Sequence, residues 1–176
     1  FTGAEVLIRD SLSILEGKAI AIAGNHTSLV FGKKHLVDTL LARGINIKNV
    51  FSPEHGFRGD ADAGATVKSI TDSQTGLPIT SLYGNNKKPK TAQLEGIDIV
   101  LFDMQDVGAR FYTYISTLSY IMEACAEAEV KVIVLDRPNP NGWYVDGPMM
   151  DAKFHSFIGM HKIPIAHGMT IGEYAQ

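Results

Sequence analysis

The residues best suited to chemistry follow short apolar runs that have the pattern of buried strands. The first run is followed by Asn25 and His26, and the second by Glu54, His55 and Arg58. Later apolar runs are followed by two further polar groups: Asp103, Gln105, Asp106 and Arg110, and then Asp136, Arg137, Asn139 and Asn141. Carboxyl and imidazole groups can transfer protons, and guanidinium groups can hold polar or anionic ligands. Because ligands of open parallel sheets bind outside the carboxyl ends of the strands, we expect one site at this edge.

Glu54 is the strongest candidate for proton transfer. It lies between Pro53, which restricts the backbone, and the pair His55-Gly56. A carboxyl group on such a rigid loop can have its pKa tuned for acid–base catalysis. The structural alternative is a loop glutamate that accepts hydrogen bonds from backbone amides or pairs with Arg58.

The later loops offer a second carboxylate and several cationic groups. Asp103 and Asp106 are candidates for the second carboxylate, and Arg110 could hold an anionic group through two hydrogen bonds. Alternatively, an Asp–Arg pair within this loop only orders it. The segment 136–140 has either a binding role or the role of a rigid turn, since Asp, Asn and Pro are turn residues. His167, just before a predicted helix, is open to both interpretations.

Other chemistries have weaker support in the sequence. The first strand is followed by Gly24-Asn25-His26 and not by G-x-G-x-x-G, and neither a P-loop nor a G-x-S-x-G pattern is present. A metal ion bound by His26, His55 and the loop of Asp103 and Asp106 is an alternative, because metal ligands can come from separate loops. We expect neither a cofactor nor a metal.

The elements that must position these groups alternate along the chain. Apolar runs predict five strands, at residues 18–23, 47–51, 79–83, 97–102 and 131–135. Apolar side chains at helical spacing predict helices over 2–15, around 36–41, and over a long segment marked by Phe111, Tyr114, Ile115, Leu118, Ile121, Met122 and Cys125. Residues 53–78 read as one long loop, which in a compact domain is usually either functional or mobile. The pattern predicts an α/β fold of three layers, with a mostly parallel sheet of about five strands.

Composition limits the class of protein. The chain has 176 residues, 45 % hydrophobic and 20 % charged residues, and a net charge of -3, which argues against a nucleic-acid partner. No apolar run reaches transmembrane length, and the single cysteine, Cys125, has the pattern of a core residue. Thr2-Gly3-Ala4-Glu5 and Thr170-Ile171-Gly172-Glu173 both have the capping-box pattern of a helix start, yet only three residues follow the second. We therefore expect a piece of a longer protein.

Several motifs together resemble one known family. They are Asn25-His26-Thr27, Ser52-Pro53-Glu54-His55-Gly56-Phe57-Arg58-Gly59, Thr75-Gly76-Leu77-Pro78, Ser81-Leu82-Tyr83-Gly84, the segment from Phe102 to Tyr114, Asp136-Arg137-Pro138-Asn139-Pro140, and His167-Gly168-Met169-Thr170. In combination they are similar to the exo-β-N-acetylmuramidases of bacterial cell-wall recycling, long classed as a domain of unknown function. The resemblance runs from about Gly17 to Glu173.

The resemblance implies a Rossmann-like N-terminal domain, here residues 1–166, with residues 167–176 starting a truncated connection to a missing C-terminal domain that completes the cleft. It implies release of N-acetylmuramic acid from the non-reducing ends of peptidoglycan fragments or muropeptides by a periplasmic or secreted protein, possibly lipid-anchored. Glu54 is then the natural catalytic acid, with Asp103 or Asp106 as its partner. The expected substrate-binding residues are Asn25, His26, His55, Arg58, Gln105, Arg110, Tyr112, Asp136, Arg137, Asn139 and His167.

Two details of this expectation concern individual side chains. Arg110 or Arg137 could pair with the lactyl carboxylate of muramic acid. Tyr112 or Tyr114 could stack on a sugar ring, but residues two apart in a helix do not share a face, so one of them should be core. The alternatives are a muropeptide-binding module without activity and a nucleotide-dependent enzyme.

Overall fold

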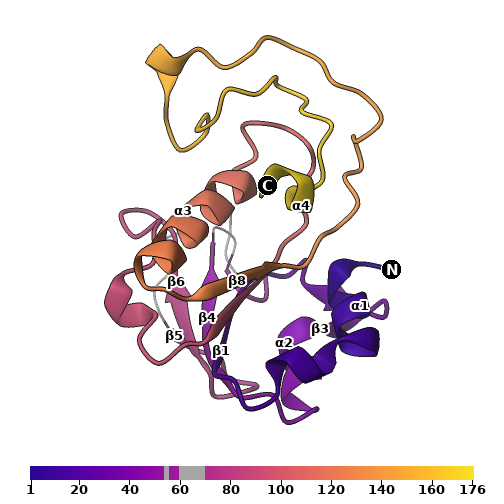
Figure 1. Ribbon diagram of the computed structural model, residues 1–176, viewed down its shortest axis with the longest axis vertical. Coiled ribbons are helices and arrows are strands. Elements are labelled where there is room, and N and C mark those ends of the chain that lie inside the picture. Colours follow the sequence, from indigo (N-terminus) through magenta and orange to yellow (C-terminus); the bar gives the residue numbers. More distant parts are fainter. Residues whose placement is uncertain (54–55, 60–69) are drawn as a thin grey trace.

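A six-stranded sheet forms the centre of the computed structural model, which describes residues 1–53, 56–59 and 70–176 (Figure 1). Its order is β5 (Ile70–Thr71), β6 (Pro78–Ser81), β4 (Ile47–Ser52), β1 (Ile20–Gly24), β7 (Ile99–Asp103) and β8 (Lys131–Val134). All neighbours run parallel except β5 and β6. The five expected strands are confirmed, with ends shifted by up to two residues. The short antiparallel β5 lies within the segment expected to be loop throughout.

The helices begin close to their expected positions, with one correction. They are α1 (Gly3–Asp10), α2 (Leu36–Leu41), α3 (Tyr114–Glu127) and α4 (Ile171–Tyr174), with short 3-10 helices at Leu12–Leu15, Thr91–Gln93 and Ala152–Phe154 and a hairpin of β2 (Leu29–Val30) and β3 (Lys34–His35). Both predicted capping boxes are formed, at Thr2 and at Thr170. Phe111 was wrongly assigned to the long helix. It precedes α3 and is 59 % exposed, because the backbone before α3 is held in a loop by contacts to other segments.

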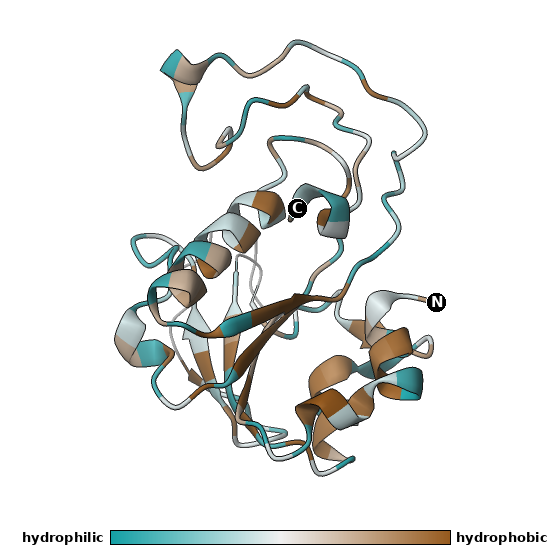
Figure 2. Cartoon of the chain, viewed as in Figure 1, coloured by the Kyte–Doolittle hydropathy of each residue, from teal (hydrophilic) through white to brown (hydrophobic). Residues whose placement is uncertain are grey.

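Alternating side chains of the strands fill two core layers. Ile20 and Ile22 pack with α1 and α2 on one face, whereas Ala21 and Ala23 pack with α3 on the other. Figure 1 shows the helices on both sides of the sheet, and Figure 2 shows hydrophobic residues over most of β7 and β8. The expected three-layer α/β sandwich is confirmed. No helix in the described ranges is long and apolar enough to cross a membrane.

The segment after β8 leaves the body of the domain and returns. Residues 141–166 form an extended arm, which Figure 1 shows projecting from the end of β8. The two sides of the arm are joined by backbone bonds between Asp146 and Ala166, and Ala166 also pairs with Ala109. The residues that follow pack against α3, where Ile171 is buried in the core. Residues 167–176 therefore pack as part of the same unit as residues 1–166.

Candidate active site at the carboxyl edge of the sheet

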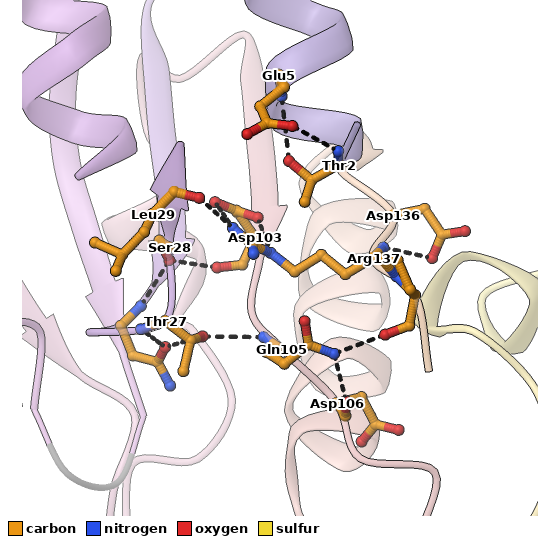
Figure 3. Close-up of polar contacts among 12 residues, drawn as sticks. Thr2, Glu5, Thr27, Ser28, Leu29, Asp103, Gln105, Asp106, Asp136 and Arg137 are labelled. Atoms are coloured by element: carbon orange, nitrogen blue, oxygen red, sulfur yellow. Dashed lines mark hydrogen bonds and ion pairs between the residues drawn. The ribbon is translucent and has the colours of Figure 1, made fainter. Parts of the chain in front are cut away.

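A buried ion pair lies at the centre of this edge. Asp103 ends β7 and is fully buried, and Arg137 follows β8 and is 7 % exposed. The guanidinium donates from Nε to Oδ1 at 2.7 Å and from Nη2 to Oδ2 at 3.1 Å. It also donates from Nη2 to the carbonyl oxygen of Leu29 at 3.2 Å. Figure 3 shows Arg137 reaching across the edge to Asp103 and Leu29. One side chain thus ties β7, the turn after β8 and the β2–β3 hairpin together.

The surroundings of Asp103 favour a structural role for it. Burial raises the pKa of its carboxyl group above the ordinary value, and the Arg137 guanidinium opposes that shift. The backbone carbonyl of Asp103 is also occupied, because it accepts a hydrogen bond from the Ser28 hydroxyl. Two carboxylate oxygens held by a bidentate guanidinium leave little capacity for a ligand. The structure also corrects the partner: Asp103 pairs with Arg137, and Arg110 pairs with neither Asp103 nor Asp106.

Asp106 and His167 form a second buried pair, in which two polar atoms are left without a hydrogen-bond partner in the described part of the chain. Asp106 is 3 % exposed, and its Oδ2 accepts a hydrogen bond from the Gly108 amide at 2.7 Å. The Nε2 atom of His167 lies 3.5 Å from the same oxygen. Since Nδ1 of His167 accepts from the Met169 amide at 3.3 Å, the neutral ring carries its proton on Nε2, facing Asp106. Within the described ranges, Asp106 Oδ1 and His167 Nε2 have no hydrogen-bond partner.

Amide side chains join the loops that carry these two pairs. Gln105 donates from Nε2 to the carbonyl oxygens of Asp106, at 2.7 Å, and Pro138, at 2.9 Å. Asn141 donates to the Val107 carbonyl at 2.8 Å. Asn139 donates to the Met169 carbonyl at 2.8 Å and accepts from the Asn141 amide. The predicted convergence of the loops after β7 and β8 is therefore confirmed, and His167 joins them from the C-terminal segment.

A glycine makes the closest approach between these loops possible. Gly108 has φ +75°, and a Cβ atom there would lie 2.4 Å from the side-chain amide of Asn139. Only glycine satisfies both the left-handed backbone and the contact. Asp106 accepts a hydrogen bond from the amide of this glycine, and Asn139 packs against the same turn. The position of Asp106 is therefore fixed.

Asn25, after β1, uses its side chain within the fold. It is fully buried, donates to the Tyr114 hydroxyl at 2.7 Å, and accepts from the amide and hydroxyl of Thr27 at 2.9 and 2.6 Å. His26 next to it is exposed. Tyr114 is the core member of the tyrosine pair, 3 % exposed, as expected for one of the two. Tyr112 lies before the helix, half-buried, with its ring edge-to-face against Tyr114 at 4.8 Å between centroids.

Arg58, after β4, is held by two carboxylates. It makes two hydrogen bonds to Asp38, at 2.8 and 3.0 Å, and two to Asp72, at 2.8 and 3.0 Å. Asp72 also accepts from the amide and hydroxyl of Thr75. The Arg58 guanidinium lowers the pKa of Asp72 to about 2, and the two carboxylates raise the pKa of Arg58. Arg58 thus anchors the segment after β4 to α2 and to the turn before β6.

Arg110 and Asp136 also hold backbone in place. Arg110 donates from Nη1 to the carbonyl oxygens of Pro148, at 2.8 Å, and Ile163, at 2.6 Å, so it clamps both sides of the arm. Asp136 accepts from the Gly172 amide at 2.7 Å and from the Thr170 hydroxyl at 2.9 Å. It therefore caps the start of α4. The rigid-turn interpretation of segment 136–140 agrees with these contacts.

Two of the predicted residues lie outside the described ranges. They are Glu54 and His55, so their predicted roles stay predictions. Within residues 1–53, 56–59 and 70–176, no group of three or more His, Cys, Asp or Glu side chains could hold a metal ion.

The sequence interpretation missed Asp38 and Asp72 as partners of Arg58. Asp38 and Asp72 lie 20 and 14 residues from Arg58 along the chain, and no sequence motif links them to it.

The comparison with protein families agrees with this architecture. The family model described as exo-β-N-acetylmuramidase NamZ, N-terminal, matches residues 20–176. These residues include all the strands and loops of the site. The chain belongs to this family. The resemblance to exo-β-N-acetylmuramidases expected from the motifs is therefore confirmed, and the match spans the loops after β1, β4, β7 and β8.

Relatives and solved structures extend the NamZ match. The peptidoglycan β-N-acetylmuramidase NamZ of Bacillus subtilis (strain 168) is 47 % identical over 176 residues, covering 99 % of this chain and 42 % of that protein. A crystal structure of a DUF1343 family protein from Bacteroides fragilis NCTC 9343 superposes with a TM-score of 0.84 at 49 % identity, covering 97 % of this chain and 44 % of that one. A second from the same organism gives 0.90 at 41 % identity, covering 99 % and 44 %. The chain spans less than half the length of these relatives.

Proposed function

We propose that this chain is the Rossmann-like part of an exo-β-N-acetylmuramidase, a glycoside hydrolase that releases N-acetylmuramic acid from the non-reducing ends of peptidoglycan fragments. The observation that carries the proposal is the 47 % identity, over nearly the whole chain, to a relative named peptidoglycan β-N-acetylmuramidase. The site geometry supports it, because carboxylates, amides and an imidazole converge at the carboxyl edge of the sheet. That edge is where α/β sheets bind their ligands.

In this proposal Glu54 is the general acid. Glycoside hydrolysis requires a proton for the leaving oxygen as the glycosidic bond breaks, and a second group that activates or orients the attacking nucleophile. For N-acetyl sugars that nucleophile can be water or the acetamido oxygen of the substrate. The Glu54 carboxyl would supply the proton, and water supplies the atoms that complete the two products.

We propose Asp106, rather than Asp103, as the second carboxylate. Both oxygens of Asp103 are engaged by Arg137, and removing that partner would leave a buried charge. Asp106 instead keeps Oδ1 without a partner in the described part of the chain, and the Nε2–H of His167 faces its other oxygen. A buried acceptor without a partner is costly, and such an atom is suited to a ligand or water hydrogen bond.

The test is turnover of a chromogenic N-acetylmuramide by the full-length protein. Glu54→Gln should lower kcat by about 10²- to 10⁴-fold, since that is the usual contribution of general acid catalysis. Glu95→Gln is the matched control, because Glu95 is an exposed glutamate that precedes the amino end of β7, at the opposite edge of the sheet, and it should leave turnover unchanged. Near-normal turnover by Glu54→Gln would remove Glu54 as the acid. Asp106→Asn should slow turnover while the protein stays folded, which circular dichroism checks.

We further propose that a second domain, in the region that the relatives have and this chain does not span, supplies the opposite wall of the cleft. We also propose that the protein is periplasmic or secreted, possibly lipid-anchored. The support is that the chain spans 42 % of its Bacillus relative and that peptidoglycan lies outside the cytoplasmic membrane. Fractionation of cells that produce the tagged full-length protein tests the location. Recovery in the cytosol alone would contradict it.

A further inference from the structure

We propose that Trp143 and Tyr144 form a saccharide-binding platform, which holds a sugar ring of the peptidoglycan glycan next to the residue being released. The proposal rests on the proposed function and deepens it by adding a binding site for the rest of the substrate. It starts from one unusual side chain. Trp143 is the only tryptophan of the chain and is 82 % exposed. Large exposed aromatic side chains at a site edge are typical of binding surfaces.

The platform is held in place by its neighbours. The ring of Tyr144 lies against that of Trp143, with 4.5 Å between centroids and 52° between planes. The backbone on one side is fixed by the Gly142 amide, which donates to the Asn139 carbonyl at 3.0 Å. On the other side, a Cβ atom at Gly168 would meet Val145 at 2.8 Å and the Tyr144 carbonyl at 3.1 Å, so the two segments are in close contact. Because the backbone on both sides is held, only the side-chain torsions of the two rings lose conformational entropy when a ligand binds.

The platform is also joined to the loops that carry Asp106 and His167. Asn141, two residues before Trp143, donates to the carbonyl of Val107, and Val107 directly follows Asp106. Two residues of extended chain reach at most about 7 Å. On the other side, Gly168, which contacts Tyr144 and Val145, directly follows His167. The aromatic pair is therefore connected on both sides to the loops of the Asp106–His167 pair.

The chemistry of the platform suits a glycan. A pyranose ring has apolar C–H faces and polar edges, so it can stack on an indole ring while its hydroxyl and amide groups bond to polar neighbours. The Asn141 side-chain oxygen and the exposed Asp146 carboxylate, two and three residues from Trp143 along the chain, are polar groups of this segment. An exo-acting enzyme must hold the remaining glycan while the terminal residue occupies the catalytic site. An aromatic platform whose backbone is joined to the loops of Asp106 and His167 meets that requirement.

Trp143 itself provides the first measurement. Because it is the single tryptophan, the fluorescence of the 176-residue chain reports on this ring alone. We expect emission typical of an exposed indole, and a saturable blue shift on titration with a tetrasaccharide of alternating N-acetylglucosamine and N-acetylmuramic acid. An emission spectrum that stays constant up to millimolar tetrasaccharide would overturn the proposal. So would a blue shift that depends on protein concentration without saccharide, because the ring would then be covered by a second copy.

Kinetics of the full-length protein separate binding from chemistry. Trp143→Ala should raise KM for the tetrasaccharide about tenfold, the effect of one lost aromatic contact, and leave the chromogenic monosaccharide unaffected. Trp143→Tyr should retain most of the affinity. Phe154→Ala is the matched control, since Phe154 is another exposed aromatic residue of the arm, at 65 %, and should change neither substrate. Equal KM values for Trp143→Ala and the unchanged protein would refute the platform, whereas failure of Glu54→Gln to slow turnover would refute only the catalytic assignment.

Discussion

The Asp103–Arg137 pair allows the sharpest test of how the site is built. Asp103 is fully buried and Arg137 is 7 % exposed, so each charge depends on the other for its stabilisation in the protein interior. Arg137→Met keeps most of the side-chain volume but removes the charge, and it leaves a buried carboxylate without its partner. Breaking such a buried pair by removing one member costs about 3–5 kcal/mol. The free energy of unfolding of the variant should fall by that amount.

Thermal and urea unfolding, followed by circular dichroism, measure this loss. A chain of this size loses about 2–4 °C of Tm per kcal/mol, so Arg137→Met should melt about 6–20 °C lower. The double variant Asp103→Leu/Arg137→Met should recover part of the loss, because it buries neither charge. The matched control is Arg9→Met. Arg9 pairs with Asp10 at 2.6 Å, but both side chains are nearly half exposed, so its loss should change the unfolding midpoint very little.

Two results would refute this reasoning. If Arg137→Met is no less stable than Arg9→Met, the buried pair contributes as little as a surface pair, and Asp103 would again be available for catalysis. If the double variant is less stable than Arg137→Met alone, the loss comes from packing or from the hydrogen bond to the Leu29 carbonyl and not from the unpaired charge. The order of the three variants in stability therefore shows whether the loss comes from the unpaired charge or from altered packing.

Two further predictions concern the loops around this pair. Gly108→Ala should lower the free energy of unfolding, measured in urea, by about 1–3 kcal/mol. Gly84→Ala is its control, since both glycines have positive φ but only Gly108 has a neighbour, Asn139, within 4 Å. Equal losses in the two variants would show that the contact with Asn139 contributes nothing. Because Arg58 lowers the pKa of Asp72 to about 2, their pair stabilises the fold above about pH 4 and its contribution, up to about 2 kcal/mol, is lost as the pH falls toward 2. Urea midpoints between pH 2 and 5 should therefore fall less steeply for Asp72→Asn than for the unchanged chain, and parallel curves would contradict the pairing.

The local features of the fold were predictable from the sequence because they depend on neighbouring residues. The strands are continuous apolar runs, since a parallel sheet covered on both faces buries every side chain, as it does along β1 and β7. The capping boxes at Thr2 and Thr170 need only a residue and its third neighbour, so both were found. The expectation that the polar strand ends share one edge follows from parallel topology alone.

The sequence by itself thus determined the layers, the sheet and the edge that carries the site, whereas only the tertiary structure decided which polar side chains hold the edge together. Arg137 engages Asp103 across 34 residues, and Arg110 binds carbonyls of the arm rather than either carboxylate. Asp106 keeps an oxygen without a partner in the described chain, a fact that no spacing encodes. The physical reason is that an ion pair between loops depends on distances set by the packed sheet, and residue type alone shows only that a charge is available.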